Sequence, residues 1–276
     1  CRRKSSLAQR CRRVTDNNFR DYPVALRHIK TDIQWGDKMS NRKDLDDTIN
    51  RLGLRAAILV VVLGVVSGFF PLDAPQGAFS DRMLWYSHNL TAFTFGWAVQ
   101  MVAMLVLSGF FATIAWTARS SHPISSFLAG TALLISVVCF LIPKFIAIWS
   151  IPQMVEASAR MSHDADLAGQ LFQLLHPSLS FSLFTSFDYL GFWMYAIFCL
   201  FLVAPLYRLS TDAKIAAVTF GLFGVLYHAL LLGVMFGGIA SEEIGDYANM
   251  LFLLLLIPVI AMGLYFRTQV KNMADG

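Results

Sequence analysis

Six apolar segments separated by short polar loops constrain this chain more than any other feature. They run approximately Leu54–Phe70, Leu90–Ala118, Ile124–Ile151, Leu179–Leu206, Ile215–Ala240 and Tyr247–Phe266. Each is near or above the roughly 18 apolar residues that cross a hydrocarbon core of about 30 Å. Backbone amides find no water inside a bilayer, so such segments are expected to be helical. The sequence therefore predicts an all-α, six-helix transmembrane bundle.

Composition agrees with a membrane protein. Apolar residues make up 56% of the chain, above the roughly 45–50% of soluble domains. Cys139 and Cys199 lie inside apolar segments, where a free thiol behaves as a small hydrophobe. They predict neither a disulfide framework nor a thiolate metal site. The run Ala56–Phe70 is followed by no clear small-x-small cleavage site, which favours a retained first span over a signal peptide.

The net charge of +4 comes from the first 38 residues. Ten of the 22 basic residues precede Met39, and the rest of the chain carries 12 basic and 14 acidic residues. We therefore expect no nucleic-acid partner. Residues 1–38 show no apolar period, so we expect either a disordered basic tail or an upstream extension that is not native. Gly36-Asp37-Lys38-Met39 can be encoded by a ribosome-binding sequence before a start codon, which favours Met39 as the native start. Residues 39–276 would then form one transmembrane domain.

Basic and acidic loops alternate along the chain. One set carries Arg42, Lys43, Arg51, Arg55, Arg119, Arg208, Lys214, Arg267 and Lys271. The other set has only Arg82 and Arg160 against Asp73, Asp81, Glu156, Asp164, Asp166, Glu242, Glu243 and Asp246. Because the basic side of a membrane protein is cytoplasmic, this alternation predicts that both termini are cytoplasmic and that an acidic face points outward.

Two outer loops are long enough to hold structure. Pro71–Asn89 contains Trp85, Tyr86 and His88, an aromatic group typical of the interface belt. Gln153–Pro177 places Leu167, Leu171, Leu174 and Leu175 at helical spacing, with polar residues between them. This pattern predicts an amphipathic helix before span four, lying on the outer surface or capping the bundle.

Small residues recur at four-residue spacing on two spans. Gly64 and Gly68 lie on span one, and Gly233 and Gly237 on span five. Such faces let helix backbones approach closely. They serve packing within the bundle or mark a homodimer contact, and both interpretations stay open.

Polar residues inside the spans are the candidate site. Ionisable groups in a bilayer are costly unless they are paired or wet. Lys144, Asp188, His228 and Gln100 all fall at or above the middle of the bilayer, toward its outer side. Lys144 and Asp188 lie on consecutive antiparallel helices, roughly 10 Å and 13 Å from the outer ends of their spans at 1.5 Å per residue. A salt bridge between them is therefore geometrically available.

Two interpretations of these residues remain. In the structural one, Lys144 snorkels outward, Asp188 pairs with it, and His228 bonds a neighbouring helix. In the functional one, they form an outward-facing polar pocket for a small or lipophilic ligand, with Tyr189, Trp193 and Tyr227 as lining. Pro143 loosens the helix beside Lys144, which slightly favours a site. A proton relay is a third, lesser interpretation.

Enzymatic readings find little support. A b-type haem needs two axial ligands facing one cavity, and His88 and His228 are the only pair to consider. His88-Asn89-Leu90 followed by Phe95-Gly96-Trp97 is faintly like a haem-bearing oxidase helix, but the paired histidines are missing. The sequence contains no zinc-protease, hydrolase or phosphate-loop motif, so it predicts no catalytic residue, metal ligand or cofactor.

From about Arg51 to Arg267 the chain resembles a broad family of bacterial six-span inner-membrane proteins of unknown function. The resemblance is carried by the first span, the Asp188-Tyr189-Leu190-Gly191 stretch, Ala204-Pro205-Leu206 before Arg208, and Met262-Gly263-Leu264-Tyr265-Phe266-Arg267. It implies an architecture and a bacterial cytoplasmic membrane, but no activity. The sequence thus predicts a multi-pass protein that binds, senses or moves a small or lipophilic molecule. A haem redox protein and a structural subunit of a membrane complex are the alternatives.

Overall fold

A computed structural model describes residues 23–75, 77–160, 165–177, 179, 182–240 and 243–275, with side chains from residue 43 onward. The chain divides into two compact units between Asp47 and Thr48. Helix α2 (Pro23–Ser67) runs through this division and through Met39. Residues 1–22 lie outside the described residues, so a domain boundary at Met39 stays a prediction.

Six helical segments are long and apolar enough to cross a membrane. They are Lys43–Ser67, Phe79–Ala118, Pro123–Ala159, Leu183–Tyr207, Thr211–Met235 and Ile244–Asp275. The helices after α2 are α3 (Phe79–Ala118), α4 (Pro123–Phe145), the π-helix η1 (Ile146–Ser150), α5 (Ile151–Ala159), α6 (Ala165–Leu174), α7 (Leu183–Tyr207), α8 (Thr211–Met235), α9 (Ile244–Leu254) and α10 (Leu256–Asp275). The described residues include no strand. The all-α, six-helix architecture is confirmed, and the protein is an integral membrane protein.

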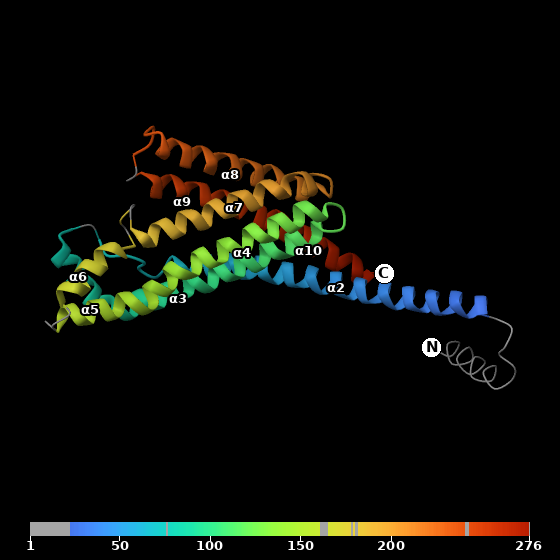
Figure 1. The fold of residues 1–276 in the computed structure, drawn as a ribbon, viewed down its shortest axis with the longest axis horizontal. Helices are drawn as coiled ribbons and strands as arrows, with labels where there is room; N and C mark the ends of the chain where they lie inside the picture. Colours follow the sequence, from blue (N-terminus) through green and yellow to red (C-terminus); the bar gives the residue numbers. More distant parts are fainter. Residues whose placement is uncertain are drawn as a thin grey trace. The chain divides into compact units, whose positions relative to one another are not determined.

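Neighbouring helices pack in a simple order. α4 packs against α3 and α7, α7 packs against α8, and α8 packs against α10 (Figure 1). The contact between α4 and α7 is close because Gly191 leaves room for the Phe140 ring, which lies 2.8 Å from where a Cβ at Gly191 would stand. Ser136 Oγ also donates to the Gly191 carbonyl across this contact, at 2.8 Å.

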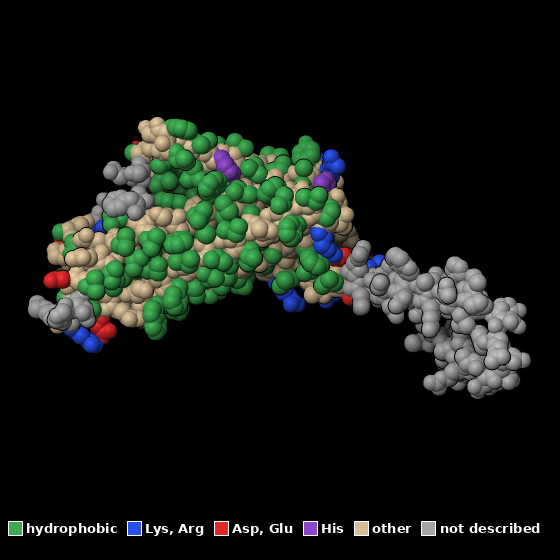
Figure 2. All heavy atoms as spheres, viewed as in Figure 1, with side chains coloured by type: hydrophobic (Ala, Val, Ile, Leu, Met, Phe, Trp, Pro, Cys, Tyr) green, Lys and Arg blue, Asp and Glu red, His purple; other side chains and the backbone are tan. Residues whose placement is uncertain are grey.

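The main core of the bundle is aromatic. Phe111 stacks on Phe198 with ring centroids 5.0 Å apart, and Tyr195 and Phe220 meet its edges. The buried Tyr195 hydroxyl pairs with Ser108 Oγ at 2.6 Å, so its polar end is satisfied. Outside this core, hydrophobic side chains cover much of the helical face seen in Figure 2, as expected of a surface that contacts lipid.

A second, smaller core stands at the end of the bundle that the loop charges predict to be outer. We call this region the outer cap and define it as residues 71–75, Phe79–Leu90 of α3, α5 and α6. α3 has 40 residues and α7 has 25, which corresponds to about 60 Å and about 37 Å of helix. The cap arises because α3 and the α4–α5 segment extend past the start of α7. Its centre is the buried pair Tyr86 and Phe172, whose rings meet edge to face at 5.2 Å.

Two predictions about the outer loops need correction. The helix expected within Gln153–Pro177 is present as α5 and α6, but Leu167, Leu171 and Leu174 are exposed. Ala168 and Phe172 face the core instead, because Phe172 fits between the rings of Tyr86 and Phe79. Tyr86 itself is fully buried, so it belongs to the cap core and not to an exposed interface belt.

The second pair of small residues does not form a helix face. α8 ends at Met235, not at Ala240, and Gly237 adopts a left-handed φ of 72° just beyond it. Only glycine enters this region without strain. Gly233 receives the Ile239 side chain of the same turn, 2.7 Å from a Cβ at that position. A homodimer through Gly64 and Gly68 stays a prediction.

Candidate functional site

Lys144 and Asp188 form the ion pair that the sequence predicts. Lys144 Nζ on α4 donates to Asp188 Oδ1 on α7. The ammonium also lies 5.6 Å from the centre of the Trp97 ring and 5.0 Å from that of Phe140. Cation–π contacts of this kind favour a charge that has left water. Lys144 is only 3% exposed and the Asp188 side chain 18%, so the pair is a largely buried junction of α3, α4 and α7.

Asp188 lies nearer the end of its helix than expected. α7 begins at Leu183, because Ser182 Oγ caps the helix by accepting from the Thr185 N–H. Asp188 is therefore about 7 Å from the outer end of α7 at 1.5 Å per residue. The ion pair marks the level at which the membrane bundle meets the outer cap.

Two prolines shape the helix beside Lys144. Pro143 and Pro152 lack N–H groups, so neither can continue the α-helical bonding pattern. The π-helix Ile146–Ser150 lies between them.

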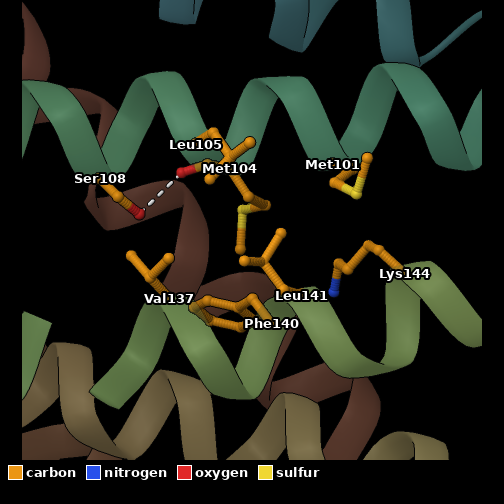
Figure 3. A pocket seen from close by; sticks show the side chains of 8 residues that line it. All are labelled: Met101, Met104, Leu105, Ser108, Val137, Phe140, Leu141 and Lys144. Atoms are coloured by element: carbon orange, nitrogen blue, oxygen red, sulfur yellow. Dashed lines mark hydrogen bonds between the residues drawn. The ribbon is translucent and has the colours of Figure 1, made fainter. Parts of the chain in front are cut away.

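Next to Lys144 is a cavity of about 10 Å³ whose far end is Ser108 (Figure 3). It has room for about one water molecule, so this cavity is too small for a ligand.

Tyr227 and Tyr189 connect α8 to α7. The Tyr227 hydroxyl donates to the Tyr189 backbone carbonyl at 3.1 Å, and Tyr227 is fully buried. Its ring also packs on Phe192 with centroids 6.2 Å apart. Tyr227 therefore links α8 to α7 by a hydrogen bond, and its buried side chain does not face an open pocket.

His228 and Trp193 form a separate pair on the same two helices. Trp193 Nε1 donates to His228 Nε2 at 3.1 Å, and His228 Nδ1 donates to the Gly224 carbonyl at 2.7 Å. Both ring nitrogens are used, which corresponds to a neutral imidazole protonated at Nδ1. The interpretation that His228 bonds a neighbouring helix is confirmed.

The histidines do not fit a b-type haem. An axial ligand needs a ring nitrogen with a free lone pair, and at His228 the Nε2 lone pair accepts from Trp193 while Nδ1 bonds the helix carbonyl. His88 is exposed on the part of α3 that belongs to the outer cap. His228 lies farther along α8, six residues before the turn that begins at Val234. Neither histidine lines the cavity beside Lys144 or the cleft that contains Gln100.

Gln100 lies apart from the other six candidates, in a cleft of about 360 Å³ between α2, α3, α9 and α10. The described residues that line this cleft are uncharged, and almost all are apolar. The Gln100 side-chain amide forms no hydrogen bond with any described residue, and the side chain is half-buried. This is an unpaired amide within a membrane span.

The cleft exists because α2 approaches α10 closely at one end only. Gly53 admits the Phe266 ring, 2.7 Å from where its Cβ would stand, and Ala57 packs 3.2 Å from such a position at Gly263. Farther along α2, Gly64 has no atom within 4 Å of its Cβ position. The outer half of α2 therefore stands away from the bundle, and Gly64 faces the opening.

The seven candidate residues thus fall into separate places. Lys144 and Asp188 form the buried junction, Tyr189 and Tyr227 join two helices beside it, and Trp193 and His228 pair farther along those helices. Gln100 lines the cleft of about 360 Å³, which is large enough for a ligand. One shared outward-facing pocket is not formed by these residues.

A polar cluster in the outer cap was not predicted. Asp73 Oδ1 accepts from the Tyr86 hydroxyl at 2.5 Å and from the Ala74 N–H at 2.8 Å. Arg82 lies 3.7 Å from Asp73 Oδ2 and donates to His176 Nδ1 at 3.2 Å. Arg82 and Tyr86 are four residues apart and so share a helix face, which is a signal in the sequence. The hydrogen bond between Arg82 and His176 joins residues 94 positions apart, so no spacing in the sequence predicts it.

Burial alters the titration of this cluster. Burial, reinforced by the Arg82 charge, lowers the pKa of His176 to about 4. Burial also raises the pKa of Asp73, although the hydrogen bonds from Tyr86 and Ala74 and the charge of Arg82 favour its carboxylate. Near pH 7 His176 is therefore the neutral acceptor of an Arg82 hydrogen bond.

The chain matches no protein-family model, and neither the curated proteins nor the solved structures contain a significant match to it. Among the described residues, no three His, Cys, Asp or Glu side chains gather in a way that could hold a metal ion. Cys139 and Cys199 are free and buried.

Proposed function

We propose that this protein binds a lipophilic molecule within the membrane, in the cleft between α2, α3, α9 and α10. The observation that carries the proposal is the unpaired Gln100 amide facing an otherwise apolar cleft. The charge pattern of the loops and the family resemblance support a bacterial cytoplasmic membrane as its location.

The chemistry of the cleft suits such a ligand. An amide without a hydrogen-bond partner in an apolar medium costs several kcal/mol, roughly 2–7 depending on the reference state. A ligand that offers a polar group removes this cost, while its hydrocarbon part covers Val60, Met104 and Val259. Ligand sites commonly measure about 300–1,000 Å³ and combine apolar lining with a few polar groups, and the cleft of about 360 Å³ falls in this range.

The ion pair supports the cleft from a distance. Trp97, which lies against Lys144, donates from Nε1 to the Leu72 carbonyl at 3.0 Å. Leu72 belongs to the segment that follows α2, and Phe70 packs over Gly96 on α3. Lys144 and Asp188 therefore act structurally, by fixing the helix that holds the outer end of α2.

The test is native mass spectrometry of the protein purified in mild detergent. The parent protein is expected to retain a lipophilic molecule, and Gly64→Leu is expected to lose it, because the new side chain enters the opening. Leucine is also a better helix former than glycine, so folding is not impaired. Gly130→Leu is the matched control, since Gly130 is a helical glycine with open space beside α4.

Three results would contradict the proposal. Retention of the molecule by Gly64→Leu would place it elsewhere, and its loss from Gly130→Leu alone would place it in the seam between α3 and α4. A parent protein that carries no such molecule after purification from its own membrane would also count against the proposal.

A structural subunit of a membrane complex is the second candidate. It is favoured by the exposed leucine row of α6, formed by Leu167, Leu171 and Leu174 at the outer cap. Exposed apolar surfaces of this kind mark interaction sites. Replacing the three leucines by Gln is expected to abolish co-purification of a partner at native expression if this candidate holds, and to leave cleft binding unchanged.

A further inference from the structure

The cleft has a direction, which gives information about its ligand. By the predicted topology α2 runs outward, so Ser67 lies at the outer end of the cleft and Val60 at the inner end. α3 runs inward, so Gln100 is outer and Leu107 is inner. Each stretch of seven residues covers about 10 Å at 1.5 Å per residue. The cleft is therefore oriented along the membrane normal.

Among the described residues that line the cleft, the polar side chains are Gln100 and Ser67, and both lie at its outer end. Gln100 offers a carbonyl oxygen and an NH₂ group, neither of which bonds a described residue. Ser67 Oγ donates to the Gly64 carbonyl at 2.9 Å and keeps lone pairs that can accept. The inner end is lined by hydrocarbon, including Leu107 and Val259. A membrane lipid of the outer leaflet has the same arrangement, with its polar part outward and its chains toward the midplane.

The lining also limits the charge of the ligand. A charged group in this position would lose water without meeting an opposite charge, since the described lining residues are uncharged. Burying an unpaired ion costs several kcal/mol even after relaxation. An uncharged carbonyl or hydroxyl, in contrast, can form one or two hydrogen bonds with the Gln100 amide.

We infer that the ligand is an outer-leaflet amphiphile whose uncharged carbonyl or hydroxyl group lies beside Gln100 and whose hydrocarbon chain points toward the middle of the bilayer. This inference rests on the proposed function and adds the class and the orientation of the ligand. A glycerolipid ester and an isoprenoid alcohol or ketone share this chemistry.

The experiment uses photoactivatable probes on the purified protein. The probes are a long-chain methyl ester, the matching primary alcohol, the matching hydrocarbon and an isoprenoid alcohol. Each of the first two is made with the photoreactive group next to the polar end or at the chain end. Labelled positions are mapped by peptide mass spectrometry, and the stronger of the ester and isoprenoid signals identifies the source of the ligand.

The ester and alcohol are expected to label the cleft more strongly than the hydrocarbon does. Probes reactive at the polar end should label the peptides of Ser67 and Phe252, and probes reactive at the chain end those of Met104 and Val259. Gln100→Leu should lower ester labelling roughly threefold to fifteenfold, the range expected for one hydrogen bond within a membrane. Hydrocarbon labelling should not change. Gln153→Leu, an exposed glutamine on α5, is the control and should leave all labelling unchanged.

The outcomes separate the two claims. If no probe labels the cleft of the parent protein, the proposed function itself is wrong. If the hydrocarbon labels the cleft as well as the ester does and Gln100→Leu changes nothing, the cleft binds lipophilic molecules but the assigned class is wrong. Labelling with the polar and chain ends reversed overturns the orientation, and this measurement needs no variant.

Discussion

At the scale of single residues, the ion pair shows how a membrane protein accommodates two charges. Lys144 and Asp188 are on different helices, and each offers the other its nearest opposite charge. The rings of Trp97 and Phe140 complete the surroundings of the ammonium. Attraction in such a dry setting offsets the lost hydration only while both partners are present. The pair is therefore sensitive to the loss of either member.

We expect Lys144→Met and Asp188→Leu to lower the free energy of unfolding when introduced singly. Breaking a buried pair costs about 3–5 kcal/mol in soluble cores, because one charge is left alone. The double variant should recover most of this loss, since no unpaired charge remains. Thermal melting in detergent measures all three.

The matched control is the pair Glu156–Arg160 on the outer surface, whose side chains are more than half exposed. Glu156→Gln should change the unfolding free energy by less than about 1 kcal/mol. Additive losses in the Lys144 and Asp188 double variant would mean that the two side chains do not depend on each other.

His176 makes a pH-dependent contribution to stability. Its pKa falls from 6.5 to about 4 on folding. A histidine with a lowered pKa stabilises the fold above its unfolded pKa, and the contribution is lost as the pH falls from about 6.5 toward 4. By this relation the loss at pH 5 is about 2 kcal/mol. His176→Gln keeps an acceptor for Arg82, so its melting temperature should fall less between pH 7.5 and pH 5.

Asp73 changes the stability with pH in the opposite direction to His176, so its contribution must be the same in the proteins that are compared. Its pKa is raised, so its contribution is present at low pH and is lost as the pH rises. Comparing parent and His176→Gln at each pH leaves the Asp73 contribution in both proteins. Equal pH dependence of the two proteins would contradict the role given to His176.

At the scale of helices, glycines decide where backbones come close. Gly224 on α8 faces α7, where a Cβ would stand 2.6 Å from Leu200 Cγ and 3.1 Å from the Ala196 carbonyl oxygen. The second contact is with backbone, which cannot move aside as a side chain can. Gly130 on α4 has nothing within 4 Å of the same position. Gly224 and Gly130 are both helical glycines, but only Gly224 has a neighbouring helix within contact distance of an added Cβ.

Gly224→Ala should lower the unfolding free energy by about 1–3 kcal/mol, the cost of overpacking a tight contact. Gly130→Ala should be neutral or stabilising by about 0.5–1 kcal/mol, because alanine favours the helix. Thermal melting of both variants tests this difference. Equal melting temperatures would show that the contact between α7 and α8 is looser than the geometry indicates.

At the scale of the whole molecule, the alternating loops predict an orientation in the membrane. A reporter that is active only in the cytoplasm should function when fused after Arg119, Ser210 or Gly276. It should fail after Gly77, Asp164 or Glu243, which belong to the predicted outer side. Activity at any of the second positions would overturn the orientation, and with it the assignment of the cleft's polar end to the outer leaflet.

The six spans and the pairing of Lys144 with Asp188 follow from the sequence alone. Apolar length sets the spans because the bilayer has a fixed thickness. The pairing follows because consecutive helices run antiparallel, so that depth along one helix corresponds to depth along the next. Both arguments use distances along the chain, which the sequence contains.

The cleft, the cap and the surroundings of each polar side chain were decided by the tertiary structure. Gln100 could not be separated from the other candidates, because the face of a long apolar helix that meets each neighbour depends on all the helices at once. The contact of Arg82 with His176 and the burial of Phe172 in place of the α6 leucines have the same origin. The sequence determined the order of the polar residues along each helix, since that order is counted along one helix, although the start of α7 at Leu183 moved Asp188 closer to the helix end than expected. Only packing decided which neighbours it meets, since rotation about the helix axis is fixed by contacts between segments far apart in the chain.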